Sequence, residues 1–156
     1  LASKKIQNIN IIIQFFEKIY PKTDKIKKDI IELSKINKNI KIVYGYLDYF
    51  KYRELLKEIN IMPILYEGDK LNFVGSGLFY SCITHEIPII IPKSASLIKN
   101  DLKYNSFLEA NTIEEYVDSV DKISKNYDFY LNECKKLSKY YKERIYSDPL
   151  VKNVIN

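Results

Sequence analysis

Strand-like and helix-like segments alternate along the first 93 residues, and this alternation restricts the folds open to the chain. Apolar runs rich in β-branched and aromatic residues predict strands at residues 9–16, 40–47, 61–66 and 87–93, with a short fifth at 105–110. Apolar residues at helical spacing separate the first four of these runs. The order predicts an α/β fold, a Rossmann-like three-layer α/β/α sandwich with a parallel sheet.

Capping residues and chain breaks predict where the helices of the first half begin and end. Thr23 or Asp24, after Pro21, can cap a helix with Ile26, Ile30, Leu33 and Ile36 on one face. Asp48 can cap the next helix, whose shared face carries Tyr52, Leu55 and Leu56. Residues 76–86 predict a short third helix before the fourth strand.

The last third of the chain is predicted to be helical. Thr112 followed by Glu115 is a capping-box pattern and starts one helix. A second helix runs from near Asp128 to about Tyr146, and residues 148–149 (Asp-Pro) break the chain before a final short helix. Residues 112–156 are therefore expected to form a helical C-terminal tail of the same domain.

Length and charge indicate the kind of protein. The 156 residues predict one domain, 1–156, and the start at Leu1 predicts a fragment of a larger protein with sequence missing upstream. No apolar run approaches the roughly 20 residues of a membrane helix. The net charge of +5 comes from abundant lysines in a composition also rich in Ile, Asn and Tyr. This bias is typical of an AT-rich genome, so no nucleic-acid partner is expected.

Cysteine and histidine are too few and too scattered to bind a metal ion. The two cysteines, Cys82 and Cys134, are separated along the chain, and His85 is the single histidine. We therefore expect no metal site, and two buried thiols in an intracellular protein. His85 is expected to end a helix with a satisfied hydrogen bond, although an acid–base role is an alternative.

The loop after the third strand contains the residues that suggest a ligand. Gly75 and Gly77 flank Ser76 at the predicted start of a helix. The first turn of a helix carries unpaired backbone N–H groups and partial positive charge, and glycines let an anion come close. The turn is suited to a diphosphate, although an ordinary capped loop has the same residues.

The wider pattern resembles a known family. A strand ending in Pro63-Ile64-Leu65-Tyr66, an irregular loop, a helix opening at Ser76-Gly77 and a strand at residues 87–92 (Ile-Pro-Ile-Ile-Ile-Pro) follow one another. This order resembles the C-terminal, nucleotide-sugar-binding domain of GT-B-type glycosyltransferases, in the group 1-like set that includes the family 4 retaining enzymes. The resemblance extends over residues 9–146.

The resemblance implies roles for particular residues. Gly75, Ser76 and Gly77 would contact the donor phosphates through backbone N–H groups. The base and ribose would lie against a second set of residues, and the sugar against a third. The base and ribose set is Gly45, Tyr46, Leu47 and Ser81, and the sugar-pocket set is Tyr66, Glu67 and Asn72.

The chain departs from the family pattern at several positions. Two glutamates eight positions apart are usual, and the matching residues here are Phe73 and Ser81. The small residue expected two positions before Pro88 is Glu86. Lys18 and Lys22 are the candidates for the phosphate-contacting cation after the first strand. The resemblance leaves the catalytic residues, the sugar and the nucleotide base unassigned.

The resemblance implies one domain of a cytoplasmic glycosyltransferase, which would be inactive as an isolated fragment. It would bind a nucleotide-diphosphate sugar, with no cofactor and no metal, for transfer to a saccharide or lipid-linked acceptor in bacterial surface polysaccharide synthesis. The missing N-terminal domain would supply acceptor contacts. Alternatives are a nucleotide-sugar epimerase of the same fold and a non-catalytic Rossmann-like interaction domain.

A basic face on the last long helix leaves a membrane contact open. Lys135, Lys136, Lys139 and Lys142 recur on this helix. A solvated surface explains them, and peripheral contact with anionic lipid at the inner face of the membrane is the alternative. The tyrosines of the same helix are expected to pack rather than to stack on bases.

Overall fold

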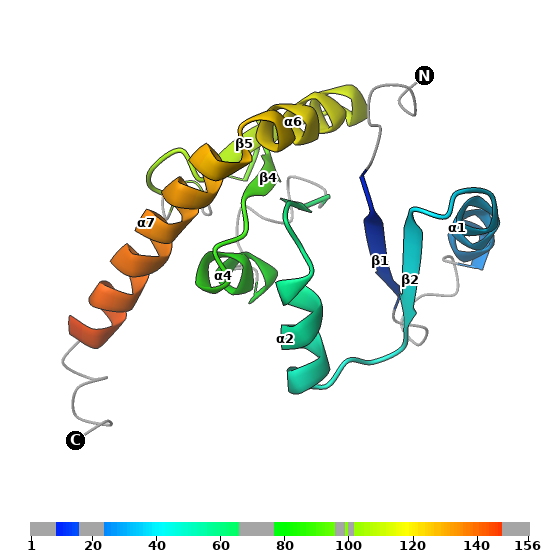
Figure 1. The fold of residues 1–156 in the computed structure, drawn as a ribbon, viewed down its shortest axis with the longest axis horizontal. Coiled ribbons are helices and arrows are strands. Elements are labelled where there is room, and N and C mark those ends of the chain that lie inside the picture. The colour runs from blue at the N-terminus through cyan, green and yellow to red at the C-terminus, as the bar shows by residue number, and fades with distance from the viewer. Residues whose placement is uncertain (1–8, 16–23, 66–76, 96–98, 100–101, 148–156) are drawn as a thin grey trace. The chain divides into compact units, whose positions relative to one another are not determined.

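The computed structural model describes residues 9–15, 24–65, 77–95, 99 and 102–147 (Figure 1). The chain divides into two compact units, Leu1–Leu55 and Leu56–Asn156. Each unit has its own parallel sheet in the described residues.

The first unit contains a two-stranded parallel sheet and a helix. Strand β1 (Ile11–Phe15) lies beside β2 (Ile40–Tyr44), and helix α1 (Asp24–Ile36) packs against β2. The apolar face expected on α1 is covered only in part, because Leu33 is 54% and Ile36 84% exposed. None of the described residues of this unit is fully buried.

Helix α2 (Tyr49–Lys57) spans the boundary between the two units. Its predicted cap is confirmed, since Asp48 Oδ1 accepts a hydrogen bond from the backbone N–H of Lys51 at 2.9 Å. This bond satisfies one of the donors that a helix leaves unpaired in its first turn. Of the three residues predicted to share a face, Leu56 is buried, and Tyr52 and Leu55 are half-buried.

The second unit contains a three-stranded parallel sheet in the order β3-β4-β5. Strand β3 (Met62–Pro63) is much shorter than predicted, whereas β4 (Ile89–Pro92) and β5 (Phe107–Ala110) lie within their predicted ranges. Pro63 has no N–H to donate and is tolerated because β3 is an edge strand. Pairing continues one residue further, where Ile64 N–H donates to Ile90 O at 2.8 Å.

Strand β4 forms the centre of the second unit. All four of its residues are buried, and successive strand residues point to opposite faces, so both faces of β4 are covered. Ile90 packs with Ala110 of β5 and with two residues from the helices, Ile123 and Tyr130, in one apolar cluster. Burial of β4 on both faces explains why the sequence is continuously apolar here.

Three helices complete the second unit. Helix α4 (Gly77–Thr84) precedes β4, and helices α6 (Ile113–Lys125) and α7 (Tyr127–Ser147) follow β5. Helix α6 packs against β4 and β5, while α7 packs against α4 and α6. The predicted capping box is confirmed: Thr112 Oγ1 accepts from Glu115 N–H, and the Glu115 carboxylate accepts from Thr112 N–H.

These elements confirm an α/β, Rossmann-like fold with parallel strands and a helical C-terminal part. In the described residues the strands form two small sheets. The predicted helix after residues 148–149 lies outside the described residues. No helix in the described part of the chain has the length and apolar character needed to cross a membrane.

Candidate functional site

Half of the residues predicted to bind the donor lie in described parts of the chain. Gly45, Tyr46 and Leu47 belong to the first unit, and Gly77 and Ser81 to the second. The other candidates lie outside the described residues, together with three positions from the family comparison. The candidates outside are Tyr66, Glu67, Asn72, Gly75 and Ser76, and the three positions are Phe73, Lys18 and Lys22.

Gly77 is the first residue of α4. A Cβ placed on it would meet no atom of the described residues within 4 Å, apart from its chain neighbours and its own helix backbone. Helix α4 connects the end of β3 to the start of β4, which is parallel to it. In such a βαβ unit the helix begins on the side of the carboxyl ends of the strands, where α/β proteins bind ligands. The first N–H groups of a helix in this position can bind an anion.

Ser81 lies one turn further along α4, and its hydroxyl is already in use. Ser81 Oγ donates a hydrogen bond to the carbonyl oxygen of Gly77 at 2.8 Å. The structure therefore joins two of the predicted site residues directly. The hydroxyl keeps a lone pair for a ligand donor but has no proton left to offer a ribose oxygen.

The far end of α4 explains the departure at Glu86. Glu86 N–H donates to Ile83 O and Ile87 N–H donates to Cys82 O, the two bonds of a Schellman motif. This motif places Glu86 in the left-handed region, with φ of 60°. Glycine adopts that conformation without strain, which accounts for the small residue expected at this position.

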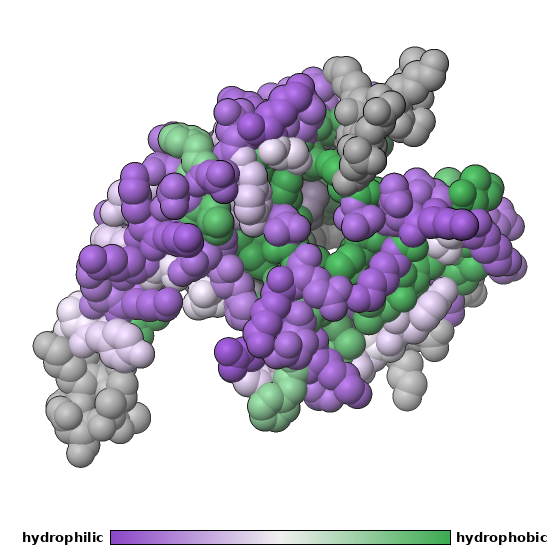
Figure 2. Space-filling model, in the orientation of Figure 1, coloured by the Kyte–Doolittle hydropathy of each residue, from purple (hydrophilic) through white to green (hydrophobic). Residues whose placement is uncertain are grey.

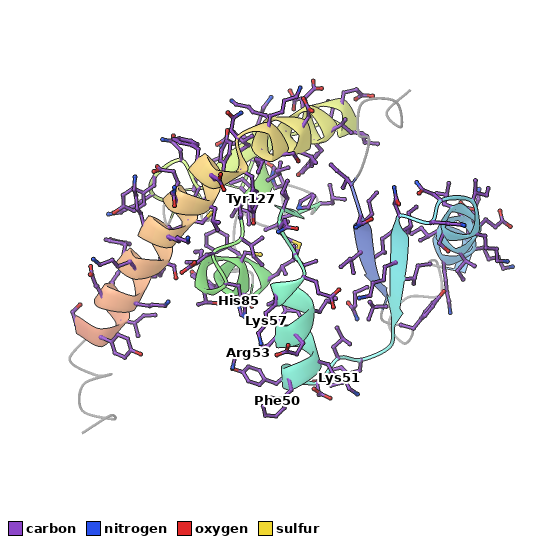
Figure 3. All side chains as sticks on the ribbon, in the orientation of Figure 1. Phe50, Lys51, Arg53, Lys57, His85 and Tyr127 are labelled. Carbon is purple, nitrogen blue, oxygen red and sulfur yellow. The ribbon has the colours of Figure 1, made fainter. Side chains whose placement is uncertain are left out.

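His85 ends α4 as predicted. Its backbone N–H donates to Ser81 O at 3.1 Å, and its Nδ1 lies 2.9 Å from the same oxygen and 3.2 Å from Thr84 Oγ1. The ring therefore has partners within its own helix. Figure 3 shows His85 on α4. The hydrogen-bonded helix-end role is confirmed.

The predicted base-binding segment follows β2 directly. Gly45 has φ of +84°, and its carbonyl oxygen accepts a hydrogen bond from Gln14 Nε2 of β1 at 2.9 Å. This bond fixes the turn at the carboxyl end of the first sheet. The next residue, Tyr46, is 77% exposed.

More exposed aromatic rings adjoin this turn within the first unit. Tyr49 and Phe50, at the start of α2, are 65% and 76% exposed and pack edge to face at 5.6 Å between ring centroids. The Arg53 guanidinium lies 5.5 Å from the Tyr49 ring centre, a cation–π distance. Figure 3 shows Phe50 and Arg53 on α2. Exposed aromatic rings offer stacking surfaces for a planar base.

Sequence reasoning missed a polar network at the carboxyl ends of β4 and β5. Lys93 directly follows β4, and its Nζ lies 2.6 Å from Glu115 Oε1. Its backbone N–H donates to Asn111 Oδ1 at 3.1 Å, and Asn111 N–H donates to Glu115 Oε2 at 2.6 Å. The signal in the sequence was the first polar residue after each of these two strands, Lys93 and Asn111.

This network fixes a cation where ligands of such sheets bind. The hydrogen bond from Lys93 and those from the Asn111 and Thr112 N–H groups hold the pKa of the Glu115 carboxyl below its ordinary value. Glu115 is therefore charged at neutral pH and orients the Lys93 ammonium group. The Lys93 side chain remains 46% exposed, so it can also meet an anion from solvent.

The thiols are buried as predicted. Cys82 is fully buried and Cys134 is 3% exposed, and both are unbonded thiols. Burial, reinforced by the charge of the other thiol, raises the pKa of Cys82 to about 12. Burial and the carboxylates of Glu86 and Glu133 raise the pKa of Cys134 to about 12. Thiols of this kind are poor nucleophiles and poor metal ligands.

Within the described ranges, no group of three or more His, Cys, Asp or Glu side chains could hold a metal ion. No model of a known protein family matches the chain, and no curated protein matches it either. Site geometry and the sequence resemblance are therefore the grounds on which a function can be proposed.

Proposed function

We propose that this chain is the donor-binding domain of a GT-B-type glycosyltransferase, and that it binds a nucleotide-diphosphate sugar. The observation that carries the proposal is Gly77, which opens α4 after β3 and whose added Cβ would meet no atom of the described residues within 4 Å, its chain neighbours and own helix backbone aside. A diphosphate carries negative charge that the first N–H groups of a helix can stabilise without a metal ion.

Two further features support the same ligand. Lys93, at the carboxyl end of β4, supplies an ammonium group for the phosphates. Tyr46, after β2, offers an exposed ring on which a base could stack, an interaction worth about 1–3 kcal/mol. Under this proposal, a partner domain supplies the acceptor.

Calorimetric titration with UDP and GDP, and then with their sugars, tests the proposal. We expect saturable binding that Gly77→Ala weakens at least about tenfold, because its methyl group would stand between the backbone and the phosphate. Tyr46→Ala should weaken binding about as much. Neither substitution should unfold the chain, since the added methyl at Gly77 would clash with no described residue and Tyr46 is exposed.

Glu86→Gly provides a matched control at the other end of α4. It relieves backbone strain without touching the first turn of the helix, so nucleotide binding should be unchanged. A folded chain that binds no nucleotide would contradict the proposal. So would binding that Gly77→Ala leaves intact.

The hydrogen bond of Ser81 favours one second candidate, a non-catalytic interaction domain of the same fold. Ser81 stands where the family usually has a ribose-binding glutamate, and its proton is engaged by Gly77 O. Nucleotide binding without turnover, measured in the full-length protein with its acceptor, would favour this candidate over the transferase.

A further inference from the structure

Three lysines and a tyrosine form a stripe along the outer side of α7. Lys135, Lys139, Lys142 and Tyr146 follow one another at offsets of four, three and four residues. At 3.6 residues per turn these offsets keep the four side chains within an arc of about 60°, over about 16 Å of helix. All four are exposed, and all four line an open groove of about 580 Å³ beside Glu86. We call these four residues the α7 stripe.

The opposite side of α7 is buried, so the stripe lies on the side of the helix that faces solvent. Tyr130, Cys134 and Leu137 of α7 are buried in the second unit. Lys136 was grouped with the other lysines in the sequence, but its position on the helix places it outside the stripe. Its ammonium group lies 2.5 Å from Glu133 Oε1. Figure 2 shows hydrophilic residues along the visible side of α7.

We propose that the α7 stripe docks the protein on a membrane surface that carries anionic lipids. Lysine ammonium groups near such a surface each contribute about fivefold in affinity, without the geometric matching that arginine provides. In the described part of the chain, Lys139 of the stripe pairs with Glu143 at 3.8 Å, and this ion pair is largely exposed and therefore weak. The lysines can exchange it for lipid phosphates at little cost.

The tyrosine distinguishes a bilayer from other anionic partners. Tyr146 is 63% exposed at the end of the stripe, and its neighbour Ile145 is 50% exposed. Tyrosine is enriched at membrane–water interfaces, where the ring enters the boundary region and the hydroxyl remains hydrated. A row of cations ending in the Tyr146 ring fits a flat, charged and partly apolar surface.

Sedimentation with vesicles tests this inference independently of nucleotide binding. The probes are vesicles of phosphatidylcholine alone and of phosphatidylcholine mixed with phosphatidylglycerol. We expect binding to the mixed vesicles only, falling steeply with added salt. Replacing the three stripe lysines with Gln should weaken it by about a hundredfold or more. Tyr146→Ser should weaken it with little change in salt dependence.

A variant of equal net charge provides the control. Lys25, Lys28 and Lys35 are exposed on α1, and changing these three to Gln removes as much charge from another surface. This variant should keep most of the vesicle binding. Equal losses in the two triple variants would overturn the inference, as would failure of the wild-type chain to bind mixed vesicles. Binding to an acidic peptide or an RNA but not to mixed vesicles would overturn it as well.

Discussion

Two residues with positive φ show how backbone conformation determines whether a side chain is strained. Glu86 adopts φ of 60° without being glycine, whereas Gly45 adopts φ of +84° with free space around it. L-residues are strained in this region, and glycine is not. The conformation of Glu86 could not be read from the sequence, because it contradicts the residue preference of the left-handed region.

Reciprocal substitutions at these two positions should change stability in opposite directions. Glu86→Gly is expected to raise the free energy of unfolding by about 0.5–1 kcal/mol, since relief of strain exceeds the entropy that glycine adds to the unfolded chain. Gly45→Ala should lower it by about 1 kcal/mol through strain alone. Urea denaturation measures both. A destabilised Glu86→Gly variant would mean that the carboxylate has a structural role.

The buried thiols should be chemically silent in the native protein. Burial raises the pKa of both Cys82 and Cys134 to about 12, so almost no thiolate exists at neutral pH. A thiol reagent such as Ellman's should react only after unfolding, whereas a cysteine introduced at the exposed Ser94 should react at once. Rapid reaction of either native cysteine would contradict the burial described above.

The same thiols predict a loss of stability at alkaline pH. In the unfolded chain a thiol ionises near its ordinary pKa of 9, while the native chain keeps the proton until about pH 12. The native state therefore holds more protons between these values, and stability falls as pH rises through this window, by up to about 1.4 kcal/mol per pH unit for each thiol. Urea denaturation above pH 9 should show a shallower fall after Cys82→Ala.

At the scale of elements, the helix starts and the presence of the strands could be predicted, whereas the length of the first strand of the second sheet could not. The Asp48 cap and the Thr112 capping box depend on local residue order, which the sequence shows directly. Strand β3 depends on which neighbour it pairs with, and Pro63 removes a donor at the edge of the sheet. The link from Lys93 to Glu115 spans 22 residues and depends on tertiary structure.

The capping box of α6 and its ion pair can be separated experimentally. Thr112→Ala removes the side-chain acceptor for Glu115 N–H and should lower the free energy of unfolding by about 1 kcal/mol at neutral pH. Glu115→Gln keeps a side-chain acceptor for the Thr112 N–H but removes the charge that holds Lys93.

The two variants should differ in acid. The pKa of Glu115 is lowered in the native protein, so its stabilising effect is present above the ordinary value of 4.5 and is lost as pH falls below it. Urea titrations from pH 7 into this range should show wild type and Thr112→Ala losing stability more steeply than Glu115→Gln. Parallel curves for all three proteins would show that the ion pair contributes nothing.

At the scale of the whole molecule, burial and charge are divided unequally between the two units. The described part of the first unit contains no fully buried residue, whereas β4 of the second is buried throughout. The first unit carries 12 Lys or Arg against 6 Asp or Glu, and the second carries 13 against 14. The net charge of the chain therefore arises in the unit with the smaller core.

This division predicts two levels of local stability. Amides of β1 and β2 should exchange with solvent at least about tenfold faster than those of β4 and β5, because fewer apolar contacts oppose local opening. Added salt should slow exchange in the first unit by screening repulsion among its lysines, and should leave β4 and β5 almost unchanged. Hydrogen exchange read by mass spectrometry at two salt concentrations measures both effects. Uniform exchange, insensitive to salt, would mean that the two units unfold as one cooperative structure.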